Sequence, residues 1–302
     1  MGEILINAGC FVAIILLGIV LRRIGFFKED GFRILSQIAL KITLPAAVVV
    51  SFSNATLNPG LLIISLLGVG CGAVYILVAL LVNLRSDREQ RAFGILNLPG
   101  YNIGLFAMPF ISGFLGPMGV VTTSLFDTGN AVICLGGAYG IADGIKNGGR
   151  ISFAKVGKAL LTSVPFLAYV IMIILRLIGW QLPSPVLRFA DVIRGASTFV
   201  SMLMIGVGFQ IKVNKVQIGK ILQIVSLRYV VAVGLALIFW NLLPFDREVR
   251  TALVLLVFAP IGAATPAFTG QLKGDVGLSS AINSICIVCS VVIMTALLAI
   301  LL

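Results

Sequence analysis

The sequence predicts an all-α integral membrane protein with ten transmembrane helices. Of its 302 residues, 59% are hydrophobic and 11% are charged, and the mean hydropathy is +1.13. Soluble domains carry roughly 25% charged residues, so this composition excludes a soluble fold. At roughly 20 apolar residues per membrane helix, ten apolar runs qualify, at residues 5–21, 34–52, 61–84, 93–114, 120–141, 156–180, 193–209, 221–243, 253–268 and 278–301.

The first run is a membrane helix and not a cleaved secretory signal. Glu3 precedes it and Arg22 and Arg23 follow it, whereas a signal peptide has its basic residues in front of the apolar stretch. The net charge of +11 resides mainly between the runs, where basic residues act as orientation signals. We therefore expect a multi-pass protein of the cell membrane, in contact with lipid and without a nucleic-acid partner.

Basic residues between the runs predict how the helices are oriented. The connections after odd-numbered runs hold fifteen of them: Arg22, Arg23, Lys28, Arg33, Arg85, Arg88, Arg91, Lys146, Arg150, Lys155, Lys158, Lys212, Lys215, Lys220 and Lys273. The connections after even-numbered runs hold five: Arg176, Arg188, Arg194, Arg247 and Arg250. Connections rich in basic residues stay in the cytoplasm, so both termini are predicted to be extracytoplasmic.

The fourth and ninth runs are too rich in proline and glycine to form unbroken helices. Residues 97–117 read NLPGYNIGLFAMPFISGFLGP, and residues 258–270 read FAPIGAATPAFTG. Proline removes a backbone donor and clashes with the carbonyl one turn back. In hydrocarbon, the freed groups need partners in protein or in a water-filled cavity. Paired interruptions of this kind indicate a transporter with its binding site near the centre of the membrane.

Two short matches indicate that the chain contains a repeat. Residues 87–91 (DREQR) recur as residues 246–250 (DREVR), and Arg33 and Thr43 match Arg188 and Thr198 at nearly the same offset. Chance similarity is the alternative. Two units of five helices, residues 1–145 and 146–302, would enter the membrane from opposite sides because five is odd. We therefore expect an inverted repeat, with its site near the axis that relates the two units.

Asp127 is the most informative charged residue inside an apolar run. Thr123 lies one turn before it and Asn130 one turn after it, so the three residues share one face of the helix. A carboxylate within a membrane needs a partner, a proton or a water-filled cavity. Asp127 is thus a candidate proton acceptor or a ligand of a coupling cation. The alternative is a structural carboxylate that satisfies the broken backbone.

Polar residues near the two breaks are candidate substrate ligands. Besides Asp127 and Asn130, they are Asn97, Tyr101, Asn102, Thr265 and Asn283, with Thr269 as a further donor. Helix N-termini present free N–H groups and the positive end of the helix dipole, which can hold a carboxylate without any arginine. A small organic anion is therefore a reasonable substrate. Asn283 either completes the site or caps a neighbouring backbone group.

Three further basic residues lie inside or next to the apolar runs. Lys41, Arg194 and Arg228 are within about two turns of a predicted helix end, so their side chains can extend to the membrane interface. Asp191 stands one turn before Arg194 as a partner. We interpret all three as structural.

No enzyme and no metal site is expected. The chain has no histidine, and Cys286 and Cys289 form a single C-x-x-C pair, whereas a zinc site needs four ligands. No nucleophile and base can be recognised. We expect no cofactor other than a coupling H⁺ or Na⁺.

Motifs along nearly the whole chain resemble those of bacterial members of the auxin efflux carrier family, which is related in fold to the plant auxin carriers and the bile acid/sodium symporters. They are GIVLRRIGFF, ITLPAAVV, the N-x-x-x-x-N-x-G run from Asn97, FDTGNAV, ASTFVSMLMIGVGF and the AP…P run from Ala259. The chain departs from the family at Val200, where proline is frequent, and in its short central cytoplasmic loop.

The resemblance implies two inverted five-helix repeats whose broken helices four and nine cross near Pro109 and Pro266. It also implies a scaffold of helices 1, 2, 6 and 7, which is usually dimeric. Helices 3–5 and 8–10 would form a transport domain that moves like an elevator. Relatives carry organic anions such as malonate, malate or auxin.

We therefore expect a secondary transporter for a small mono- or dicarboxylate, held between the two broken helices beside Asp127 and Asn130. Proton coupling, sodium coupling and uniport remain open at this point. A channel, or a membrane sensor that does not transport, is the alternative on the same fold.

Overall fold

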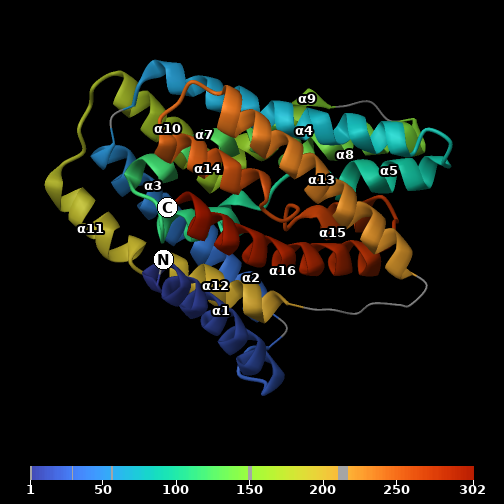
Figure 1. The fold of residues 1–302 in the computed structure, drawn as a ribbon, viewed down its shortest axis with the longest axis horizontal. Coiled ribbons are helices and arrows are strands. Elements are labelled where there is room, and N and C mark those ends of the chain that lie inside the picture. Colours follow the sequence, from blue (N-terminus) through green and yellow to red (C-terminus); the bar gives the residue numbers. More distant parts are fainter. Residues whose placement is uncertain (1, 29, 56, 149–151, 210–216) are drawn as a thin grey trace.

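The computed structural model describes residues 2–28, 30–55, 57–148, 152–209 and 217–302, and over those ranges its regular structure is entirely helical (Figure 1). Seven helical stretches in this part of the chain are long and apolar enough to cross a membrane, and a bent pair makes an eighth. The chain is thus an all-α multi-pass membrane protein, as its composition predicts. Arg150, Lys212 and Lys215, which contribute to the predicted orientation, lie outside the described residues.

The seven long stretches contain most of the helices. In the first half they are α1 (Gly2–Arg23), then α2 (Gly31–Ile38), η1 (Ala39–Thr43) and α3 (Leu44–Asn54), then η2 (Pro59–Leu62) and α4 (Ile63–Val82), then α7 (Pro117–Val132), η4 (Ile133–Gly137) and α8 (Ala138–Asn147). In the second half they are α11 (Ser184–Arg194) with α12 (Ser197–Gly208), α13 (Ile218–Leu242) and α16 (Val276–Leu301).

The seventh of the ten predicted apolar runs begins earlier in the structure than its hydropathy predicts. Residues 193–209 were expected from apolar content, but α11 already starts at Ser184. Arg188, Asp191 and Arg194 made this segment read as a connection, and all three are exposed in the structure. Charged side chains on one face do not prevent a helix from continuing, because its other face packs on α3.

The predicted run at residues 156–180 is bent. It consists of α9 (Phe153–Thr162) and α10 (Val164–Leu177), which meet at an angle of 79°. Ser163 between them is extended, and Pro165 occupies the first turn of α10. Proline is tolerated there because the first N–H groups of a helix have no intrahelical partner. The bend sends α10 toward α7, against which it packs.

Both proline- and glycine-rich segments are interrupted. In the first, α5 (Arg88–Asn97) is followed by a non-helical turn, then by the π-helix η3 (Ile103–Ala107) and α6 (Met108–Ser112). In the second, α14 (Arg247–Val257) is separated from α15 (Thr265–Gln271) by seven residues, 258–264, outside any helix. Asp87 and Asp246 of the repeated motif occupy the same place, immediately before α5 and α14.

Two helix pairs touch backbone to backbone through facing glycines. A Cβ atom at Gly129 of α7 would strike the carbonyl of Ser65 in α4, and one at Gly206 of α12 would strike that of Ile15 in α1. Small residues allow membrane helices to approach this closely. The pairs belong to different regions: α1 and α12 lie together in the lower part of Figure 1, whereas α4 and α7 lie together in its upper part.

Candidate functional site

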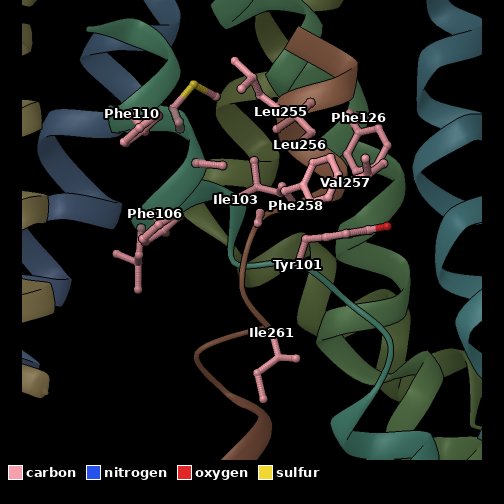
Figure 2. Close-up of a cluster of buried hydrophobic side chains, with 14 of the residues drawn as sticks. Tyr101, Ile103, Phe106, Phe110, Phe126, Leu255, Leu256, Val257, Phe258 and Ile261 are labelled. Carbon is pink, nitrogen blue, oxygen red and sulfur yellow. The ribbon is translucent and has the colours of Figure 1, made fainter. Parts of the chain in front are cut away.

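The two interrupted segments cross each other in the middle of the molecule. Figure 2 shows the extended chain through Tyr101 passing the extended chain through Phe258 and Ile261, surrounded by buried apolar side chains. A backbone hydrogen bond joins them at the crossing, from the Asn102 N–H to the Pro260 carbonyl, at 2.8 Å. Each break therefore supplies a partner for the other, as the absence of water in a membrane requires.

The crossing lies earlier in each segment than Pro109 and Pro266, and the sequence prediction on this point was wrong. Pro266 occupies the second position of α15, where a missing N–H costs no intrahelical bond. Pro109 is second in α6 but lies inside the continuous helical stretch Ile103–Ser112. The turn before Pro109 widens into the π-helix η3, and the turn before Pro45 likewise widens into η1. Wider turns relieve the clash of the proline ring with the carbonyl one turn back.

Arg228 of α13 satisfies the broken ends of α5 and α14. Its Nη1 donates to the Leu98 carbonyl at 2.6 Å, and its Nη2 donates to the carbonyls of Gly100 and Ala259 at 3.0 and 2.7 Å. The side chain is fully buried, and its guanidinium lies over the rings of Tyr75 and Tyr101. The interpretation that it extends to the interface is wrong, because its charge stays at the crossing.

Arg194 and Lys41 behave more simply. The Arg194 guanidinium pairs with the Asp191 carboxylate at 2.7 Å, and both side chains are about half exposed. Lys41 is exposed on η1. Neither residue approaches the crossing.

A cavity of about 170 Å³ opens beside the crossing. One wall contains the start of η3, at Asn102 and Ile103, together with residues 262–265, where α15 begins. Asp127 and Asn130 of α7 form a second wall. The third comes from Ser163 at the bend and from Phe166 and Tyr169 of α10. No lysine or arginine is among the described residues that line it.

Asp127 reaches this cavity with both carboxylate oxygens hydrogen-bonded by neutral groups. Oδ1 accepts from the Asn130 amide at 2.8 Å, and Oδ2 accepts from the Tyr169 hydroxyl at 3.0 Å. The two ion pairs found among the described residues lie elsewhere, at Lys146–Glu89 and Arg194–Asp191. A carboxylate held only by neutral donors keeps its charge uncompensated.

Asn130 connects Asp127 to the first break. Its Oδ1 accepts from the Tyr101 N–H and its Nδ2 donates to the Tyr101 carbonyl, both at 3.0 Å. The Tyr101 ring points away from the cavity, between Tyr75 and Phe126. Tyr101 therefore contributes its backbone to the site, and Asn130 orients both the break and the carboxylate.

Five of the seven predicted substrate ligands come together at the cavity: Tyr101, Asn102, Asp127, Asn130 and Thr265. Asn97 and Asn283 do not line it. Asn97 is fully buried in a separate network, where it accepts from Ser279 at 2.5 Å and donates to Thr269 at 3.3 Å. The Asn283 Oδ1 is buried and has no hydrogen-bond partner among the described residues.

The sequence patterns do not predict the role of Tyr169 or the depth of Arg228. Tyr169 lies in a part of α10 whose neighbouring residues are apolar, and its contact with Asp127 distinguishes it. Arg228 was noticed, but its depth was not, because distance from a helix end does not report which way a side chain points. Within the described residues, no group of three or more His, Cys, Asp or Glu side chains could hold a metal ion.

Comparison with known proteins adds one relationship. Residues 10–147 match the model of a family described as membrane transport protein. This match covers α1 to α8, including the first break and Asp127. Over these residues it supports the resemblance that the sequence motifs indicate. No curated protein matches the chain.

Proposed function

We propose that the chain, whose residues 10–147 match a family of membrane transport proteins, is a secondary active transporter of a small organic anion. The substrate would occupy the cavity beside the crossing. The observation that carries this proposal is the convergence of a helix start, two side-chain amides and a carboxylate on one cavity formed by broken helices. Broken helices at a midplane site are typical of secondary transporters.

The architecture supports alternating access by an elevator movement. The proposal takes each of the two interrupted segments as one span, in addition to the seven long stretches and the bent pair of the described residues, which gives ten spans. In the inverted repeat, residues 1–145 and 146–302 each contribute one interrupted segment. The scaffold would comprise α1, α2–α3, α9–α10 and α11–α12, and the transport domain would comprise α4–α8 and α13–α16. A homodimer through the scaffold, with both termini extracytoplasmic, follows from the resemblance and the basic residues.

The cavity can bind an anion through the dipole of a helix start and through neutral hydrogen-bond donors. The helical stretch Ile103–Ser112 starts at the cavity wall, and its first N–H groups have no intrahelical partner. Asn102, directly before it, makes no capping hydrogen bond with its side chain, and Thr265 adds a hydroxyl. These neutral donors can bind a carboxylate in the absence of arginine or lysine.

In this proposal a proton is the coupling ion, and Asp127 is the residue that binds it. Two unit negative charges about 5 Å apart repel by about 3 kcal/mol at an effective dielectric constant of about 20. No cationic side chain among the described residues of the cavity offsets this repulsion. A proton on Asp127 removes the repulsion, so the anion and one proton would bind together.

Binding can be tested with the detergent-solubilised protein and a panel of acetate, malonate and malate. A ligand at one hundred times its dissociation constant stabilises the folded state by about 2.7 kcal/mol, which thermal unfolding detects. Asn102→Ala removes a donor at the cavity and should weaken binding about tenfold. Asn241→Ala removes an exposed asparagine that bonds the Leu237 carbonyl, and it should leave binding unchanged.

Transport can be separated from the alternatives by counterflow into proteoliposomes. A carrier takes up labelled carboxylate faster when unlabelled carboxylate is inside, whereas a channel or a sensor shows no such acceleration. Binding without accelerated exchange would contradict the proposed transport. Absence of binding for the whole panel would contradict a carboxylate substrate.

A further inference from the structure

The hydrogen bond between Tyr169 and Asp127 joins two groups of helices. Tyr169 is 1% exposed on α10, and its hydroxyl donates to Oδ2 of Asp127 on α7 at 3.0 Å. In the proposed division, α10 belongs to the scaffold and α7 to the transport domain. Asp127 is thus shared, since its Oδ1 binds Asn130 within the transport domain.

Tyr169 also faces the cavity in which the substrate would sit. A phenol has one O–H and can donate it to one acceptor at a time. In the structure that acceptor is the Asp127 carboxylate. An incoming carboxylate would be a second anionic acceptor at the same cavity, and hydrogen bonds to charged acceptors are the stronger ones.

We propose that Tyr169 is a substrate-binding residue. Once Asp127 takes up a proton, the Tyr169 hydroxyl stops donating its hydrogen bond to Asp127 and donates it to the bound carboxylate instead. The proton comes from water and binds Asp127 at Oδ2, which then donates to the Tyr169 oxygen. The O–H bond formed at Oδ2, with the proton supplied by water, is the one covalent change in this step, and the Tyr169 O–H bond stays intact. The inference rests on the proposed function and adds the donor by which proton and anion favour each other's binding, a coupling that is reciprocal.

The surroundings of this pair contain few other charges. Among the described residues, Cys134 adds a titratable side chain to the cavity lining, whereas the Tyr101 ring points away from the cavity and Arg228 lies beyond that ring. On the elements packed against α10, the described charged residues are Lys41 of η1 and Lys155 and Lys158 of α9. None of them forms an ion pair with Asp127 within the described residues.

The test is the affinity for malonate and acetate of wild type and of Tyr169→Phe, measured by thermal shift at acidic and at alkaline pH. At acidic pH the Tyr169 hydroxyl of the wild type donates a hydrogen bond to the ligand, so Tyr169→Phe should bind the ligand about tenfold more weakly. At alkaline pH the hydroxyl donates to ionised Asp127 and not to the ligand, so the wild type and Tyr169→Phe should bind the ligand with the same weak affinity. The variant should therefore show a flatter dependence of affinity on pH.

Tyr229→Phe is the matched control. It removes a phenolic O–H that bonds the Cys286 carbonyl and Ser290, away from the cavity, and it should keep the wild-type pH dependence. An equal loss of affinity at both pH values would show that Tyr169 only supports the structure and would overturn the inference. Unchanged affinity at acidic pH would overturn it as well. Wild type that binds neither ligand at either pH would instead contradict the proposed function.

Discussion

Asp127 and Arg228 are both charged residues inside membrane helices, and their surroundings are opposite. Arg228 is fully buried and donates to three backbone carbonyls at the ends of two broken helices. Asp127 borders a cavity and accepts from two neutral side chains, one of them on α10. The backbone carbonyls that bind Arg228 are fixed in place, whereas the phenol and the amide that bind Asp127 are side chains that can change their hydrogen-bond partner when a ligand or a proton binds. Arg228 therefore has a structural role, and Asp127 is available for function.

Arg228→Met should produce the largest change in stability. It leaves the carbonyls of Leu98, Gly100 and Ala259 without their donor, and removing one partner of a buried charged group costs about 3–5 kcal/mol. We expect little folded protein in detergent, measured by size-exclusion chromatography and thermal unfolding. Arg228→Lys, which keeps the charge but not the fork of donors, should recover part of the loss. A methionine variant as stable as wild type would contradict the structural role.

Asn130→Ala should cost less, about 2 kcal/mol, because it leaves the Tyr101 N–H without its acceptor and the Tyr101 carbonyl with the weaker Cys134 thiol donor at 3.7 Å. It also frees Asp127 from its partner on α7. Thermal unfolding measures the stability, and the malonate affinity of the folded fraction measures the site. Thr128→Ala is a control on the same helix, because the Thr128 hydroxyl donates to the carbonyl of Ser124 in the preceding turn. Equal effects of the two substitutions would remove Asn130 from the site.

Asp127→Asn should leave the protein folded and lower proton-driven uptake by about tenfold, equivalent to about 1.4 kcal/mol. The amide keeps the shape of the carboxylate but cannot carry the proton, so counterflow should persist. Uptake and counterflow in proteoliposomes, each with and without a pH gradient, separate these effects. A variant whose uptake responds to the gradient as wild type does would exclude Asp127 from coupling. Loss of a sodium dependence would assign it to a cation.

Pro109→Ala should have the smallest effect, below about 1 kcal/mol, because Pro109 lies after the crossing and the wider turn of η3 before it accommodates its ring. Gly100→Ala is the informative comparison within the same segment. Gly100 has φ of 77°, and a Cβ there would lie 2.6 Å from the Cys134 sulfur, so the substitution is strained. Thermal unfolding and counterflow should show a clear loss for Gly100→Ala only. The reverse order would restore Pro109 as the break.

Local patterns were sufficient to predict the helical membrane fold, the two interruptions and the face that carries Asp127 and Asn130. Proline and glycine mark a break, but the position of the break depends on which carbonyls find donors. Arg228 provides those donors from a distant helix, which explains why the crossing falls before Pro109. Tyr169 could not be predicted, since its partner lies 42 positions away and no local pattern reports such a contact.

The contact of Arg228 with the first break has a consequence for biogenesis. The guanidinium follows the Leu98 carbonyl by 130 positions in the chain. At a synthesis rate of about 5–20 residues per second, that interval lasts on the order of ten seconds. During this time the ribosome has released the first broken helix, but its carbonyl ends still lack their donor. The nascent first half must therefore depend on water, lipid headgroups or the insertion machinery until α13 arrives.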